Sequence, residues 1–119
     1  MKHILAMAGF GGMAGWHYDL IEKIDGLTVA GIWDVKPERR EYALSRNIHV
    51  YQSLEDLLAD QSVDLVLVAT PNDVHKSIAI QAMEAGKNVV SEKPVTLSSQ
   101  DLREMIQASE RTGRFLTVH

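Results

Sequence analysis

Short apolar runs alternate with helical patterns along the chain, and this alternation constrains the fold more than any other feature. The runs span residues 4–7, 27–32, 49–51, 65–69, 88–91 and 115–118. They are continuous rather than alternating with polar residues, which is typical of strands buried on both faces of a parallel sheet. Because strands and helices alternate strictly, the strands are expected to pair in parallel through right-handed crossovers.

The segments between these runs carry helix signals. Pro37 stands where a first-turn proline opens a helix, expected to run through Ser45. Ser53 is expected to cap a later helix, and Ser98 or Ser99 is expected to open the last one. The resulting order predicts an α/β fold with a doubly wound parallel sheet (Rossmann), six strands in the order 3-2-1-4-5-6, and helices on both faces in a single three-layer domain.

Length and composition set outer limits on the class of protein. At about 150 residues per domain, 119 residues form one domain at most. A net charge of −4 argues against a nucleic-acid partner, which requires a concentrated basic face. The longest tightly apolar run, residues 65–69, is far too short to cross a membrane. The absence of cysteine excludes disulfides and fits a cytoplasmic protein, and no histidine pair has metal-ligand spacing, so no metal is expected.

A glycine-rich segment follows the first predicted strand and precedes a helical pattern. It matches the pattern G-x-G-x-x-G/A. In this pattern the first small residue permits a tight turn, the second lets a pyrophosphate approach the backbone, and the third lets the helix pack closely on the strand. The segment reads Gly9-Phe10-Gly11-Gly12-Met13-Ala14.

Asp34 ends the second predicted strand, 20 residues after Ala14. That is the expected position of a carboxylate that binds the adenosine ribose of a dinucleotide. The alternative is an ordinary turn together with a helix-capping aspartate before Pro37. NAD is the expected cofactor, because Asp34 repels a 2′-phosphate. NADP stays possible, because the cationic side chains that follow (Lys36, Arg39, Arg40) either hold that phosphate or form a solvated helix face.

Two further motifs add a family resemblance to this interpretation. The segment 69–75 reads A-T-P-N-D-V-H, and residues 92–94 read E-K-P. Together with the G-x-G-x-x-A-x-x-H opening at residues 9–17, they resemble the glucose–fructose oxidoreductase / inositol dehydrogenase / MocA (Gfo/Idh/MocA) family over the whole chain.

The resemblance implies a two-domain NAD(P)-dependent dehydrogenase that acts on sugars, inositols or related polyols. Residues 1–119 would form its dinucleotide-binding domain. The substrate domain, which carries a catalytic histidine in many members, is absent from this chain. The chain alone is therefore expected to fold without catalysing the reaction, and the full-length protein is expected to form a homo-oligomer.

The resemblance also assigns roles to residues near the strand ends. Lys93 would be catalytic and lie between nicotinamide and substrate, the alternative being a surface lysine in a turn. Glu92 would approach the nicotinamide ribose, unless it is a simple ion-pair partner.

The segment after the fourth strand would line the path of the cofactor through Thr70, Pro71 and Asn72, although Asn72 also suits a helix cap. His75 is placed with these cofactor-binding residues, while a histidine in a first helical turn more often packs or forms hydrogen bonds.

Two other functions compete with the dehydrogenase. A non-catalytic module that senses NAD(H) would not need a lysine beside the nicotinamide, so residues 92–94 favour the enzyme. A coenzyme A site would place a ribose 3′-phosphate next to the Asp34 carboxylate, which is unfavourable.

Overall fold

A computed structural model describes most of the chain. It covers residues 3–10, 18–19, 21, 23–24, 26–69, 72–91 and 98–118, with the side chains of 72–75 and 118 left aside.

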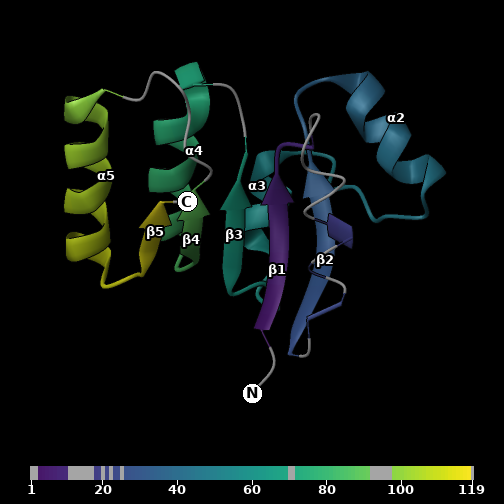
Figure 1. Ribbon diagram of the computed structural model, residues 1–119, viewed down its shortest axis with the longest axis horizontal. Helices are drawn as coiled ribbons and strands as arrows, with labels where there is room; N and C mark the ends of the chain where they lie inside the picture. Colours follow the sequence, from purple (N-terminus) through teal and green to yellow (C-terminus); the bar gives the residue numbers. More distant parts are fainter. Residues whose placement is uncertain are drawn as a thin grey trace.

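Within the described residues, five parallel strands form one sheet, shown in Figure 1, in the order β2-β1-β3-β4-β5. The elements are β1 (His3–Ala8), β2 (Leu27–Trp33), α2 (Pro37–Ser45), α3 (Leu54–Ala59), β3 (Leu65–Val68), α4 (Asn72–Glu84), β4 (Asn88–Ser91), α5 (Ser99–Thr112) and β5 (Leu116–Val118). The predicted Rossmann α/β class is confirmed. The chain crosses from β2, on one side of β1, to β3 on the other side, so that the first strand lies inside the sheet.

The predicted third strand, at residues 49–51, is shorter than expected, because this segment forms a single parallel bridge between Val50 and Ile32. Two hydrogen bonds make the bridge: Ile32 N–H donates to the His49 carbonyl at 2.9 Å, and Tyr51 N–H donates to the Ile32 carbonyl at 2.8 Å. The segment lies beside β2, where the order 3-2-1-4-5-6 puts the third strand. The apolar run is too short to extend the ladder further, since α3 is capped by Ser53 immediately afterwards.

The helix boundaries follow local signals in the sequence. Pro37 occupies the first turn of α2. Ser53 and Ser98 each accept a hydrogen bond at 3.0 Å from the backbone N–H three residues later, of Asp56 and Asp101. These side chains satisfy amides that the first helical turn leaves unpaired, as predicted.

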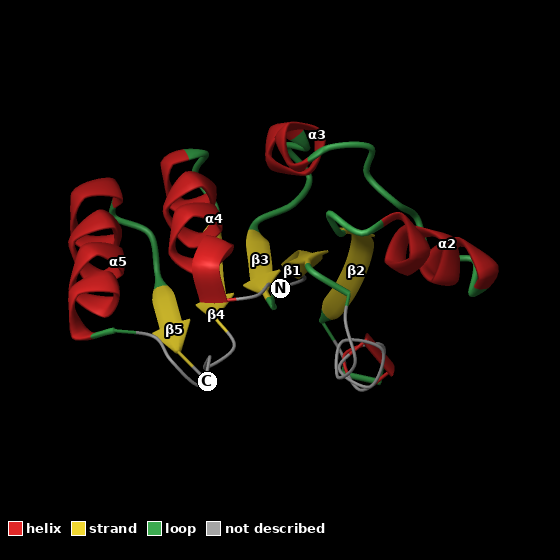
Figure 2. Ribbon diagram, turned by 90° about the horizontal axis from the view of Figure 1, so that it is seen from above, coloured by secondary structure: helices red, strands yellow, loops and turns green. Residues whose placement is uncertain are grey.

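The two faces of the sheet bury different clusters, because successive strand residues point to opposite sides. On one face lie α3, α4 and α5 (Figure 2), packed on Ala6, Ala8 and the even-numbered residues of β3. On the other, Tyr18 and Ile21 pack against Leu5, Met7, Ile32 and Leu67, a cluster that also includes Phe10 and Ala43. The candidate functional site lies where this second cluster reaches the carboxyl end of β1.

Among the described residues, no helix combines the length and the apolar composition that crossing a membrane requires.

Candidate functional site

The predicted site residues follow the carboxyl ends of neighbouring strands. Gly9 comes directly after β1, Asp34 after β2 and Ala69 after β3. All strands are parallel, so these ends meet at one edge of the sheet, where the arrowheads lie in Figure 1. In open α/β sheets this edge, at the point where the strand order reverses, is where ligands bind.

Gly9 turns the chain sharply at the end of β1. Its φ of 104° lies in a region that side chains with a Cβ rarely adopt. Its N–H donates to the Trp33 carbonyl at 2.6 Å, which ties the start of the turn to the last residue of β2. The first glycine of the motif thus has the tight-turn role that its position in the sequence predicts.

The Asp34 carboxylate joins the end of β2 to the glycine-rich turn that follows β1. One oxygen, Oδ2, accepts the Phe10 N–H at 2.8 Å, and the other, Oδ1, accepts the Lys36 N–H at 2.8 Å. The residue is only 8% exposed. Backbone donors to a buried carboxylate are the strong, charge-assisted kind, so Asp34 is held in one orientation against the glycine-rich turn.

This arrangement leaves Asp34 able to bind a further group. An ionised carboxylate has about four acceptor positions, and the described backbone donors use one on each oxygen. A pair of vicinal hydroxyls supplies two hydrogen-bond donors. A buried carboxylate beside a glycine turn therefore fits the adenosine ribose of a dinucleotide, on the chemistry of the donors and acceptors present.

Arg40 supports this carboxylate from α2. Its Nη1 donates to the Asp34 carbonyl at 2.8 Å and to the Val35 carbonyl at 3.4 Å. Part of the guanidinium is thus committed to the protein backbone. Of the three cations considered for a 2′-phosphate, Lys36 lies on the exposed surface, while Arg39 and Arg40 are half-buried.

Several predicted site residues lie outside the described part of the chain. Asn72 opens α4 and His75 stands in its first turn, but their side chains are not described. The predicted cofactor and catalytic roles of this whole set stay predictions. The residues outside the description are Gly11, Gly12, Met13, Ala14, Thr70, Pro71, Glu92 and Lys93.

An aromatic cluster beside the glycine turn was not predicted. The Phe10 ring, 1% exposed, meets the Tyr18 ring edge-on at a centroid distance of 6.4 Å and the Tyr42 ring at 5.9 Å. The Arg46 guanidinium lies over both tyrosine rings, 5.7 and 5.9 Å from their centroids, and its Nη2 pairs with Asp19 Oδ1 at 2.5 Å. The pair with Asp19 raises the pKa of Arg46. These residues come from three segments with no common spacing, so no sequence motif marks them.

A second polar cluster lies at the opposite edge of the sheet, near the amino ends of β3 and β4. Lys87 is 5% exposed, and its Nζ donates to the carbonyls of Asp60 at 2.6 Å and Val63 at 2.7 Å. Asp60 ends α3 and accepts the Tyr51 hydroxyl at 2.7 Å. Burial lowers the pKa of the Lys87 ammonium.

The carboxylate of this second cluster is stabilised in its charged form. The pKa of Asp60 is lowered most by the hydrogen bond from Ser62 and next by the hydrogen bond from Tyr51. Burial is the largest cause that raises the pKa of the Tyr51 hydroxyl. The hydrogen bond from this hydroxyl to Asp60 raises the pKa further. All of these hydrogen bonds join parts of the protein to one another, so the cluster has a structural role.

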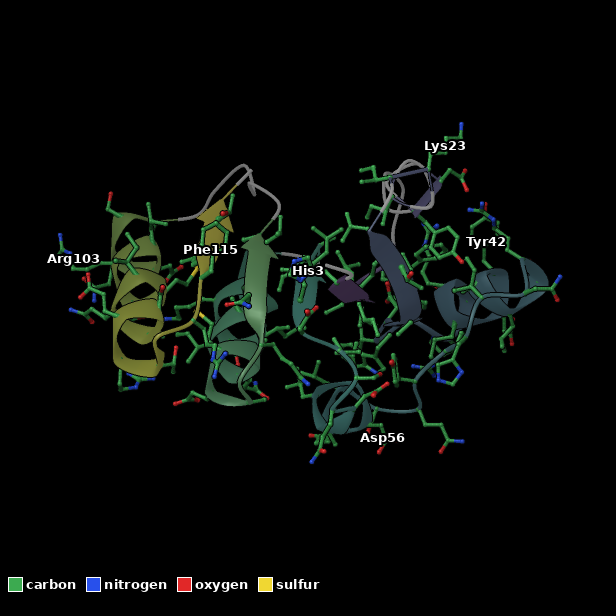
Figure 3. All side chains as sticks on the ribbon, turned by 90° about the horizontal axis from the view of Figure 1, so that it is seen from below. His3, Lys23, Tyr42, Asp56, Arg103 and Phe115 are labelled. Carbon is green, nitrogen blue, oxygen red and sulfur yellow. The ribbon has the colours of Figure 1, made fainter. Side chains whose placement is uncertain are left out.

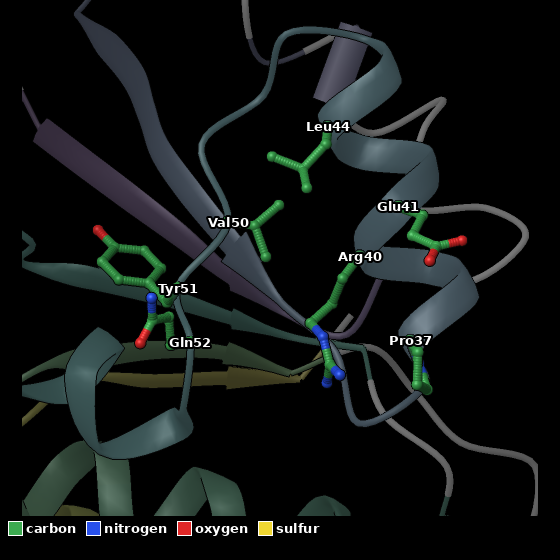
Figure 4. A pocket seen from close by; sticks show the side chains of 7 residues that line it. All are labelled: Pro37, Arg40, Glu41, Leu44, Val50, Tyr51 and Gln52. Carbon is green, nitrogen blue, oxygen red and sulfur yellow. The ribbon is translucent and has the colours of Figure 1, made fainter.

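A pocket of about 400 Å³ lies between α2 and the segment that follows Val50. Leu44 and Val50 point toward one another across it in Figure 4. Arg40 is its link to the site, because the same side chain holds the Asp34 carbonyl. None of the predicted cofactor residues lines it. The lining residues are Pro37, Arg40, Glu41, Leu44, Val50, Tyr51 and Gln52.

Comparisons with known proteins agree with this geometry. The family model described as "Oxidoreductase family, NAD-binding Rossmann fold" matches residues 4–119. The crystal structure of an NAD-binding protein from Listeria innocua is 45% identical, covers 100% of this chain and superposes with a TM-score of 0.94. The WlbA dehydrogenase of Bordetella pertussis, solved in complex with NADH and UDP-GlcNAcA, is 31% identical over 98% of this chain, with a TM-score of 0.90.

A curated relative extends the comparison to a named activity. The inositol 2-dehydrogenase of Salmonella typhimurium is 28% identical over 80% of this chain. The chain spans only 29% of that protein, 35% of the Listeria protein and 36% of the Bordetella dehydrogenase.

A glycine turn at the end of β1, a buried carboxylate at the end of β2 and a family match over residues 4–119 agree with one another. The chain therefore belongs to the Gfo/Idh/MocA oxidoreductase family, in which it forms an NAD-binding Rossmann domain.

Proposed function

We propose that this chain is the dinucleotide-binding domain of a dehydrogenase that transfers a hydride between a nicotinamide cofactor and a sugar, an inositol or a related polyol. The observation that supports this most directly is the Asp34 carboxylate, held against the glycine turn by the Phe10 N–H at 2.8 Å, where the donors that the structure describes use one acceptor position on each oxygen.

We propose NAD as the preferred cofactor. A 2′-phosphate on the adenosine ribose would bring negative charge against the buried Asp34 carboxylate, which disfavours NADP. Arg40 already donates to two backbone carbonyls beside Asp34, so fewer of its donors remain for a phosphate. The turn at residues 9–14 would bind the pyrophosphate through its backbone N–H groups.

We propose that the remaining roles belong to residues after β3 and β4. NAD, when bound, supplies the carbon that accepts or returns the hydride. The Lys93 ammonium would stabilise the negative charge that develops on the substrate oxygen as its proton leaves. Glu92 would bind the nicotinamide ribose. Thr70, Pro71, Asn72 and His75 would line the cofactor's path.

The substrate class is inferred from relatives. The Bordetella dehydrogenase was solved with a nucleotide sugar, and the Salmonella relative is named for inositol. Both are rich in hydroxyl groups on carbon, the group that a nicotinamide enzyme oxidises. In the relatives, about two thirds of the length lies beyond the part that this chain matches. We propose that a second domain of the full-length protein holds the substrate, that the full-length protein forms a homo-oligomer, and that it works in the cytoplasm.

The test is the Lys93→Ala variant of the full-length protein, assayed with NAD against a panel of sugars and inositols. Turnover is expected to fall by about 10²–10⁴-fold, the range for loss of a group that acts on the transferred proton. The thermal midpoint should stay unchanged, and Lys23→Ala, at an exposed position in Figure 3, serves as the matched control. Turnover near that of the unmodified protein would show that Lys93 is an ordinary surface lysine.

A further inference from the structure

The turn that binds the cofactor is flanked by side chains that meet in one cluster. Phe10 stands at its start and is held twice, through its backbone N–H on Asp34 and through its buried ring on Tyr18 and Tyr42. A displacement of the Phe10 ring would therefore shift the amide that contacts Asp34. The position of the Phe10 amide and the packing of its ring are mechanically linked.

Arg46 holds the other members of the cluster. It caps the C-terminal end of α2, where its own backbone N–H donates to the Ala43 carbonyl at 3.0 Å. From there its guanidinium covers the rings of Tyr18 and Tyr42, and pairs with Asp19 at 2.5 Å. Tyr18 and Asp19 are helical residues downstream of the glycine turn. One side chain thus fastens α2 both to the helix beyond the turn and, through two rings, to the residue at the start of the turn.

We propose that Arg46 is a positioning residue for the pyrophosphate-binding turn. It acts through Tyr18, Tyr42 and Asp19 rather than by touching the cofactor. The planar guanidinium is required, because it stacks on two rings while pairing with a carboxylate, which a lysine ammonium cannot do in the same way. This inference rests on the cofactor site proposed above and adds a residue that no binding motif contains.

The proposal predicts a selective loss of affinity. Arg46→Gln should raise the Kd for NAD by about five- to ten-fold, the change expected when a stacked cation and its ion pair are lost. The Kd for adenosine should change by less than about two-fold, because the Asp34 carboxylate keeps its hydrogen bond from the Lys36 N–H and adenosine lacks the pyrophosphate. A purely structural defect would weaken both ligands in the same proportion.

The experiment is a calorimetric or competition titration of NAD and adenosine with the full-length protein and its variants. Arg103→Gln is the matched control, since it removes the same charge from an exposed site at the far end of the molecule from Tyr42 (Figure 3). Asp19→Asn removes only the ion pair from a largely exposed carboxylate, and should shift NAD affinity in the same direction even if Arg46→Gln does not fold.

The outcomes separate this inference from the proposed function. Failure of the unmodified protein to bind NAD would contradict the cofactor site itself. If the unmodified protein binds NAD, equal affinity in Arg46→Gln, or equal losses for NAD and adenosine, would overturn the positioning role. Full affinity in Arg46→Lys would overturn it as well, because charge alone would then suffice.

Discussion

The two edges of the sheet each bury a charged group, but they leave it in different states. At the carboxyl edge, Asp34 is 8% exposed, and each of its oxygens accepts one backbone N–H from the residues that the structure describes. At the amino edge, Lys87 is 5% exposed and donates to two carbonyls of the protein. The first charge is the proposed contact for a ligand, whereas the second joins α3 to the start of β4.

The difference shows how one sheet separates binding from stability. The burial of the Lys87 ammonium is offset by its hydrogen bonds to the carbonyl of Asp60, at the end of α3, and to that of Val63, just before β3. A cation at the end of α3 is also favoured by the helix dipole. The described amides that orient Asp34 use one acceptor position on each of its oxygens. Substitutions at the amino edge should therefore change the free energy of unfolding, and substitutions at the carboxyl edge should change the affinity for NAD.

The largest effect on stability is expected at Lys87. Lys87→Met keeps the apolar stem but leaves the Asp60 and Val63 carbonyls without their donor, which should lower the free energy of unfolding by about 2–4 kcal/mol. Urea unfolding measures this loss, and Lys23→Met, at an exposed site, is the control. NAD affinity of the folded variant should be unchanged. A large change in Kd would mean that the amino edge also shapes the cofactor site.

Replacing one glycine with alanine at each edge of the sheet tests both edges with the same chemical change. Gly9 and Gly86 have φ of 104° and 88°. Because a Cβ is strained at such angles, alanine at either position should lower the free energy of unfolding of the protein by about 1–2 kcal/mol. Gly86 precedes Lys87 at the amino edge, and a Cβ there would meet no atom within 4 Å. Gly9→Ala should weaken NAD binding and Gly86→Ala should not, as measured by calorimetry. Equal effects on NAD would contradict the assignment of the turn to the cofactor.

The smallest effect is the acid dependence of stability. Because its pKa is lowered in the folded state, Asp60 stabilises the protein fully above its ordinary pKa of 3.8, and this contribution is lost as the pH falls through the folded value. Denaturant unfolding between pH 7 and 3 should show the loss, and Asp60→Asn should make the dependence shallower. The effect is modest, because Asp60 is only half-buried and water screens its interactions. An unaltered slope in the variant would exclude Asp60 as its source.

Much of the fold can be predicted from local sequence signals. The continuous run at residues 65–69 predicts a buried strand, and β3 is that strand. Pro37, Ser53 and Ser98 predict helix starts through backbone chemistry that acts within one turn. The segment at 49–51 has the same apolar character, yet its strand is reduced to one bridge, because the length of a strand also depends on where the neighbouring helix begins and not on composition alone.

The site divides in the same way. Gly9 and Asp34 are predictable because the motif fixes their spacing, and the structure brings them together through Phe10. The contacts of Arg46 with Tyr18 and Tyr42 join residues 28 and 4 positions apart on two segments, so no single periodicity reveals them. The burial of Lys87 is equally invisible in the sequence, since lysine is rarely buried and its partners are carbonyls that every residue carries.

The most direct test of the account is one substitution made at both edges. Asp34→Asn places an amide against the N–H of Phe10 or Lys36 and removes the charge that a ribose would meet, so the Kd for NAD should rise by about ten-fold or more, the loss of one charge-assisted hydrogen bond. Asp60→Asn disturbs the contacts with Tyr51 and Ser62, and should lower the thermal midpoint while leaving the Kd within about two-fold. Calorimetric titration of NAD into both variants gives the answer. Unchanged affinity in Asp34→Asn, or a comparable loss in Asp60→Asn, would contradict the assignment of cofactor binding to the carboxyl edge.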